Sequence, residues 1–182
     1  MEGGINAWNG LVAEGPPESG MAYFSSATKP EELIVLAWHL EDGASKFYSE
    51  MTQRSEDREA QDLFKWLVTE EERHKASLLQ LNRKLSGMTP DQVFQGSAIS
   101  SEEGGDVMEG GMSVHDVLMW AREKTLIDVL DLSLSLETHT YDLFLKMGRQ
   151  VEDQNSEEIF QVLAKETKEH LERLSSFLEK RI

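Results

Sequence analysis

Cysteine is absent from this sequence, which excludes disulfide bonds, thiolate metal sites and a cysteine nucleophile. The sequence also has no apolar run long enough to cross a bilayer, and Met1-Glu2-Gly3-Gly4 lacks the basic start of a signal peptide. Positive charge is scarce: 18 lysines and arginines against 34 aspartates and glutamates give a net charge of −16. Such a surface repels nucleic-acid phosphates and anionic lipids. The sequence therefore predicts a cytoplasmic protein without a nucleic-acid or membrane partner.

The composition changes once along the chain. Residues 1–27 are rich in glycine, proline and serine and show no sustained hydrophobic period, so they are interpreted as a flexible tail. Residues 28–182 hold the periodic segments and are long enough for one domain with its own core. Hydrophobic residues make up 39% of the sequence, which is typical of a folded chain.

Four long segments carry apolar residues at helical spacing: about 28–53, 56–85, 125–148 and 153–181. A shorter helix is predicted over 113–122. The expected N-caps are Thr28, Ser55 or Asp57, Ser113 and Thr125. The expected helix ends are Gly87 and Gly148. Strand signals are absent, so the predicted class is all-α.

The sequence repeats itself with a shift of 96 residues, so that residues 30–84 fall on 126–180 without a gap. The matched pairs include Leu36 with Leu132, Glu41 with Glu137, Met51 with Met147, Phe64 with Phe160, Glu70 with Glu166, and His74 with His170. A repeat of this length predicts two similar helical hairpins packed face to face. The glycine- and serine-rich connection 86–112 would then be the long crossover of a ferritin-like four-helix bundle.

The repeat also singles out four polar residues, Glu41, His74, Glu137 and His170. Each lies on an apolar helical stripe and should point inward. A buried carboxylate without a partner costs several kcal/mol or becomes protonated, so a shared cation is the favoured explanation. Glu71 lies close enough to His74 around its helix to reach the same centre, and so does Glu166 relative to His170.

The alternative to metal binding is a structural role in the core. A core Glu–His pair can be a structural hydrogen bond, although four positions related by one repeat favour metal binding. Tyr48 and Tyr141 are interpreted as core residues or as hydrogen-bond donors to the ligands, rather than as redox centres.

The segments "LEDGASKFY", "LETHTYDLF" and "TEEERH" resemble the ligand motifs of the rubrerythrin branch of the ferritin-like superfamily. The resemblance covers roughly residues 28–181. It implies a carboxylate-bridged di-iron site, carried over position by position onto Glu41, Glu71, His74, Glu137 and His170. Glu71 would be the bridge, and the other four would be terminal ligands.

Two positions depart from the family pattern. Thr167 stands three residues before His170, where the motif has a glutamate, and Glu166 is the candidate replacement bridge. Thr140 stands where many rubrerythrins carry a further glutamate. The four-cysteine rubredoxin module is also missing. The resemblance therefore leaves open whether one or two ions bind and whether the protein is an enzyme.

The N-terminal stretch "GGINAWNGLVAEG" resembles the last segment of a rhodanese domain. We interpret residues 1–27 as a remnant of a rhodanese–rubrerythrin fusion, and an unrelated tail is the alternative. Only about fifteen residues match, so this resemblance carries no activity.

The sequence thus predicts an iron-binding protein of the rubrerythrin type that reduces peroxide or dioxygen with electrons from a separate donor protein. Manganese or zinc would suit the same carboxylate and imidazole ligands. A homodimer is expected from the resemblance alone. Metal sequestration without turnover and a metal-free interaction bundle are the alternatives.

Overall fold

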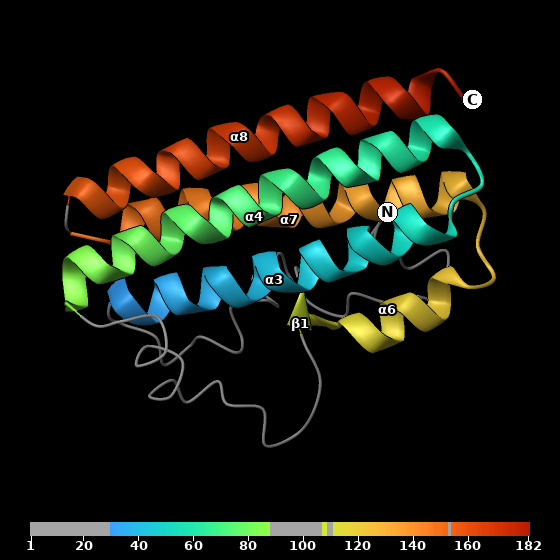
Figure 1. The fold of residues 1–182 in the computed structure, drawn as a ribbon. Helices are drawn as coiled ribbons and strands as arrows, with labels where there is room; N and C mark the ends of the chain where they lie inside the picture. Colours follow the sequence, from blue (N-terminus) through green and yellow to red (C-terminus); the bar gives the residue numbers. More distant parts are fainter. Residues whose placement is uncertain (1–29, 88–106, 109–110, 153) are drawn as a thin grey trace, which may run out of the picture.

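Four long helices run alongside one another in the structure, a computed structural model that describes residues 30–87, 107–108, 111–152 and 154–182 (Figure 1). They are α3 (Pro30–Arg54), α4 (Arg58–Ser86), α7 (Leu126–Gln150) and α8 (Gln154–Glu179). The short helix α6 (Val114–Ala121) lies beside α3. The prediction of an all-α four-helix bundle is confirmed.

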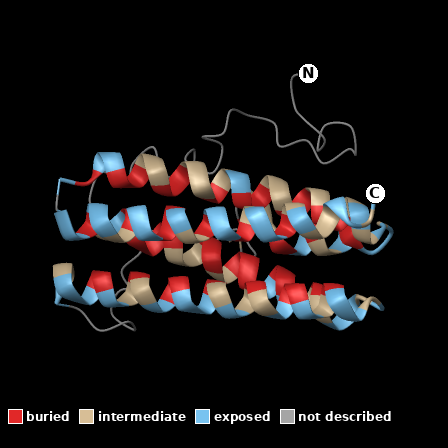
Figure 2. Cartoon of the chain, turned by 90° about the horizontal axis from the view of Figure 1, so that it is seen from above, coloured by how far each residue is buried: buried red, intermediate tan, exposed pale blue. Residues whose placement is uncertain are grey.

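The bundle consists of two hairpins, α3–α4 and α7–α8, whose helices pack extensively against each other. Contacts between α4 and α8 bring the two hairpins together. Buried residues lie on the inner faces of the helices and exposed residues on the outer faces (Figure 2). This arrangement matches the two hairpins that the repeat predicts. Within the described ranges, no helix combines the length and the apolarity needed to cross a membrane.

The helix ends follow the capping residues, with one exception. Asp57, Ser113 and Thr125 accept hydrogen bonds from backbone N–H groups as N-caps, and Gly87 ends α4 with φ of 67°. Gly148 was expected to end α7, and that prediction is wrong because the helix continues to Gln150. The predicted cap at Thr28 and the tail 1–27 lie outside the described residues.

A small antiparallel ladder precedes α6 and was not predicted from the sequence. β1 (Val107–Met108) pairs with β2 (Met112–Ser113). β1 lies directly on α3 at Gly43, where an added Cβ would overlap the carbonyl oxygen of Val107 and lie 2.8 Å from the Cβ of Met108. Met108 is completely buried. The end of the crossover therefore packs on the bundle through a helix position that only glycine fits.

The apolar core is divided into two clusters. One is built around Phe47, Phe64 and Leu130, and the other around Leu36 and Phe144. On every long helix a short stretch of buried polar residues separates the part in one cluster from the part in the other. A polar layer thus crosses the middle of the bundle, and this layer contains the candidate site.

Candidate metal centre

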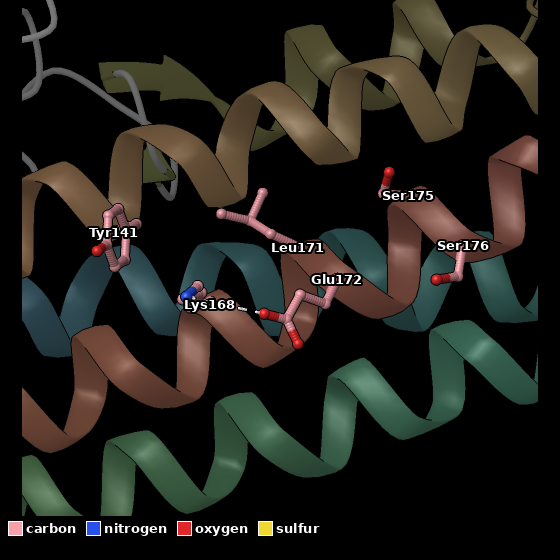
Figure 3. Close-up of a pocket in the computed structure, with 6 residues that line it drawn as sticks. All are labelled: Tyr141, Lys168, Leu171, Glu172, Ser175 and Ser176. Atoms are coloured by element: carbon pink, nitrogen blue, oxygen red, sulfur yellow. Dashed lines mark ion pairs between the residues drawn. The ribbon is translucent and has the colours of Figure 1, made fainter.

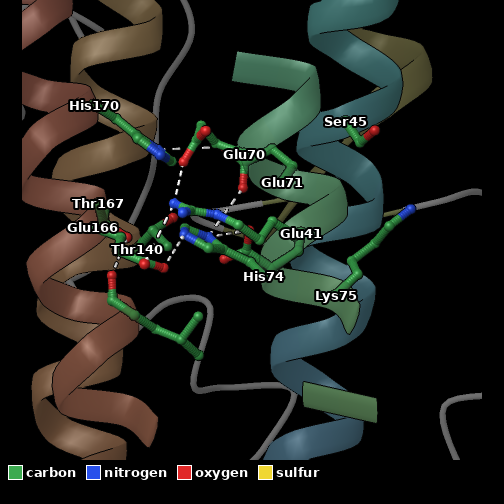
Figure 4. A network of polar contacts seen from close by, with 12 residues as sticks. Glu41, Ser45, Glu70, Glu71, His74, Lys75, Thr140, Glu166, Thr167 and His170 are labelled. Atoms are coloured by element: carbon green, nitrogen blue, oxygen red, sulfur yellow. Dashed lines mark hydrogen bonds and ion pairs between the residues drawn. The ribbon is translucent and has the colours of Figure 1, made fainter. Parts of the chain in front are cut away.

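Five buried acidic and imidazole side chains converge in the polar layer, with contributions from all four long helices. Figure 4 labels four of them, Glu41, Glu71, His74 and His170. Glu41 comes from α3, Glu71 and His74 from α4, Glu137 from α7, and His170 from α8. None of the five is more than 4% exposed. The inward orientation that the repeat predicts is therefore present at each position.

The side chains form two groups that share one member. Glu41, Glu71 and His74 make one group, and Glu71, Glu137 and His170 make the other; within each group the potential ligand atoms lie within 4.8 Å of one another. Glu71 belongs to both groups. The chain therefore offers two adjacent places for an ion with a carboxylate between them.

Each histidine faces a glutamate of its own hairpin through Nδ1. The Nδ1 atom of His74 lies 3.1 Å from Oε2 of Glu41, and that of His170 lies 3.0 Å from Oε2 of Glu137. The two imidazole rings are nearly parallel, with an interplanar angle of 13° and centroids 5.2 Å apart. The 96-residue repeat in the sequence thus appears as a repeated Glu–His contact in the structure.

Burial and mutual repulsion dominate the electrostatics of the cluster. Burial raises the pKa of Glu71 well above 4.5, and the neighbouring charges of Glu41 and Glu137 raise it further. Burial alone would lower the pKa of His74, but the charge of Glu41 and the bonds to its carboxylate neighbours outweigh that effect and raise this pKa above 6.5. The pKa of His170 is raised for the same kind of reason, chiefly by Glu137. Without a metal, the cluster therefore favours the binding of protons.

The donor set fits a bound cation. Oε1 of Glu41 is buried and has no hydrogen-bond partner, although a buried carboxylate oxygen normally has one. Three carboxylates and two imidazoles are ligands that iron, manganese and zinc accept. An ion at this position would satisfy the unpaired oxygen and compensate the repulsion that raises the pKa of Glu71.

Glu166 takes a different position from the other five candidates. Its Oε2 lies 3.3 Å from Nε2 of His74, on the opposite side of the ring from Glu41, and its Oε1 lies 3.4 Å from Arg73. Its side chain is 23% exposed. The close contact with His74 lowers the pKa of Glu166, because a positive charge on the imidazole favours the ionised carboxylate. Glu166 belongs to neither of the two groups, so its ligation stays a prediction.

Thr140 and Thr167 are buried in the polar layer of α7 and α8. The hydroxyl of Thr167 donates to the carbonyl of Leu163 at 2.9 Å, and that of Thr140 donates to the carbonyl of Leu136 at 3.3 Å. Both hydroxyls are thus engaged by their own helices.

Two aromatic residues, Tyr48 and Trp66, contact members of the cluster. The hydroxyl of Tyr48 donates to Oε1 of Glu137 at 2.7 Å, as the interpretation of Tyr48 as a hydrogen-bond donor suggested. The ring of Trp66 meets the ring of His170 edge-on at 5.2 Å. Trp66 and Arg73 were missed in the sequence because partly exposed aromatic and charged residues are common on helices. The helical spacing of Arg73 from Glu70 was the only available signal.

Tyr141, by contrast, lies away from the cluster and lines a surface cavity of about 610 Å³ between α7 and α8 (Figure 3). The other lining residues are Lys168, Leu171, Glu172, Ser175 and Ser176, and Lys168 pairs with Glu172 at 3.9 Å. None of the candidate ligands lines this cavity. The candidate centre is therefore a buried layer rather than a surface pocket.

The fold and the cluster together define an all-α four-helix bundle with a buried carboxylate–histidine centre that could hold metal ions. No protein-family model and no curated protein matches the chain. Among solved structures, a hypothetical protein from Pyrococcus furiosus is similar, with a TM-score of 0.61 and 23% sequence identity over 91% of this chain and 95% of that chain. At this identity the similarity concerns the fold alone.

Proposed function

We propose that this protein binds iron in a carboxylate centre of the rubrerythrin type and reduces peroxide or dioxygen with electrons from a separate donor protein. The observation that carries the proposal is the pair of buried Glu–Glu–His groups sharing Glu71. The resemblance of the helical motifs to rubrerythrins adds the identity of the metal and the reaction. The separate donor protein and the homodimer are also part of the proposal, and they too rest on this resemblance.

In this proposal the chain's own residues hold the centre and shield it. Glu71 is the shared carboxylate, whereas Glu41 with His74 and Glu137 with His170 complete the two halves. Tyr48 fixes one oxygen of Glu137 by its hydrogen bond. The two apolar clusters on either side of the layer exclude water. When bound, a pair of iron ions would supply the two electrons that cleave an O–O bond.

Metal uptake tests the proposal directly. We expect the protein reconstituted anaerobically with Fe²⁺ to retain iron after desalting, and an ion at 100 times its Kd should stabilise it by about 2.7 kcal/mol. For a chain of this length that free energy raises Tm by about 5–10 °C. Replacing Glu41 and His74 together with alanine should abolish both effects. His115→Ala is the matched control, because His115 is exposed on α6.

Turnover is tested on the loaded protein. Rapid mixing of the Fe²⁺-loaded protein with hydrogen peroxide should oxidise the bound iron faster than free Fe²⁺ under the same conditions. The double variant should show only the rate of free iron. An iron-loaded wild type that reacts no faster than free iron would rule out the peroxide reaction while leaving metal binding intact.

Metal binding without turnover is the second candidate, and the two buried threonines favour it. Thr140 and Thr167 occupy positions where rubrerythrins have carboxylates, and their hydroxyls are engaged by backbone carbonyls. Fewer carboxylates compensate less of the charge of an oxidised metal pair. Stoichiometric metal uptake without accelerated peroxide consumption would favour sequestration.

A further inference from the structure

The ring of His74 lies between two sets of carboxylates. Its Nδ1 faces Glu41 at 3.1 Å and Glu71 at 3.5 Å, whereas its Nε2 faces Glu166 at 3.3 Å. An imidazole that binds a metal through one nitrogen usually donates its other N–H to a carboxylate or carbonyl, and this contact fixes the tautomer and the ring orientation. Figure 4 shows Glu166 reaching His74 from α8.

We propose that Glu166, anchored by Arg73, acts as the outer carboxylate of His74 and leaves Nδ1 as the nitrogen that binds a metal. The inference rests on the proposed metal centre and deepens it. Glu166 is then a positioning residue rather than a bridging ligand. Oε2 of Glu166 is within reach of Nε2 of His74, although the two atoms are not aligned for an ideal hydrogen bond.

Arg73 contacts the carboxylate of Glu166 on the side away from His74. Its guanidinium lies 3.4 Å from Oε1 of Glu166 and also pairs with Glu70. One oxygen of Glu166 therefore faces a cation at the surface, and the other faces the buried imidazole. Moving Glu166 inward to bridge two metals would break its contact with Arg73. The structure thus favours a fixed outer position.

The half of the centre that contains His170 has no such outer carboxylate anchored by an arginine. Nε2 of His170 is buried and has no hydrogen-bond partner. The repeat places Glu70 at the position equivalent to Glu166, but Glu70 pairs with Arg73 instead. The position equivalent to Arg73 is Glu169, an exposed acid that cannot serve as such an anchor. One arginine therefore makes the two halves unequal, and the half with His74 should bind metal more tightly.

Zinc titration of the full chain tests the inference, because Zn²⁺ is bound by carboxylate and imidazole ligands and is diamagnetic. Isothermal calorimetry of the wild type should show a tight and a weaker binding event. Glu166→Ala should weaken the tight event about 10–100-fold without changing the stoichiometry. Glu166→Gln should retain most of the affinity, because its amide oxygen can still accept from Nε2–H. Glu169→Gln, one turn away on the exposed face of α8, is the matched control and should change nothing.

Nitrogen NMR of the zinc-loaded protein supplies a readout that a merely structural role would not move. His74 should be protonated at Nε2 and metal-bound at Nδ1 in the wild type, and Arg73→Ala should weaken the Nε2 hydrogen bond. Loss of one zinc equivalent in Glu166→Ala would overturn the inference, because Glu166 would then be a ligand. Unchanged affinity in that variant would overturn it too. If the wild type binds no zinc or iron, the proposed function falls as well; if it binds and the variant binds equally, only the inference falls.

Discussion

Replacing Gly43 with alanine tests how the crossover strand β1 packs on helix α3. In an unobstructed helix this change stabilises by about 1 kcal/mol, because alanine loses less backbone freedom on folding. Here the added methyl group would overlap the carbonyl oxygen of Val107 and lie 2.8 Å from the Cβ of Met108. Because the neighbouring backbone itself must shift, the cost of overpacking lies in the upper part of the usual range, at about 2–3 kcal/mol. The balance of the two effects is an expected net loss of about 1–2 kcal/mol.

Urea denaturation followed by circular dichroism measures this loss, which corresponds to a fall in Tm of about 2–8 °C for a chain of this length. Gly148→Ala is the matched control in α7. Its added Cβ would lie 3.4 Å from the Cβ of Phe160, which is an ordinary van der Waals contact. That variant should be neutral or gain up to about 1 kcal/mol. If Gly43→Ala gains as much as Gly148→Ala, the strand does not pack on the helix as described.

Three further predictions concern the polar layer. In chelator-treated protein, the free energy of unfolding should fall as the pH rises from 4.5, because the raised pKa values of Glu71 and His74 mean that the native state binds more protons than the unfolded chain. Urea denaturation between pH 4.5 and 9 measures this free energy. A free energy of unfolding that rises over this pH range would contradict the prediction. Tyr48→Phe removes the 2.7 Å hydrogen bond to buried Glu137 and should lower stability by about 1.5–3 kcal/mol without changing metal stoichiometry, as checked by denaturation and elemental analysis. Thr167→Glu adds a buried acid and should therefore lower the Tm of the metal-free protein, whereas Zn²⁺ should restore it. An equal loss of Tm with and without Zn²⁺ would show that position 167 does not face the ions.

The helices and the inward ligands could be predicted because both depend on periodicity. Apolar spacing gave the helical segments to within a few residues, and the 96-residue repeat identified Glu41, His74, Glu137 and His170 as equivalent inward positions. Gly148 shows the limit of such local signals. Glycine often ends a helix, but here it lies inside α7 opposite Phe160, a tertiary contact that the local sequence does not encode.

The ladder β1–β2 and the position of Glu166 could not be predicted from the sequence, for two different reasons. Two-residue strands are too short to show an alternating pattern. Helical spacing places Glu166 near His170, one turn further along α8, yet in the structure it pairs with His74 of the other hairpin. Which histidine it meets depends on how α4 and α8 pack, and on Arg73, which belongs to α4.

The division of the ligands between two hairpins also affects the order of folding. In each hairpin only a few residues separate the end of one helix from the start of the next, between Arg54 and Arg58 and between Gln150 and Gln154, so its contacts are local and form early. Docking of the hairpins comes afterwards, and it must bring Glu41, Glu71 and Glu137 together and remove them from water. The slow step of folding should therefore be the docking of two preformed hairpins. Protons or a divalent cation would accelerate that step by neutralising the carboxylates as they approach.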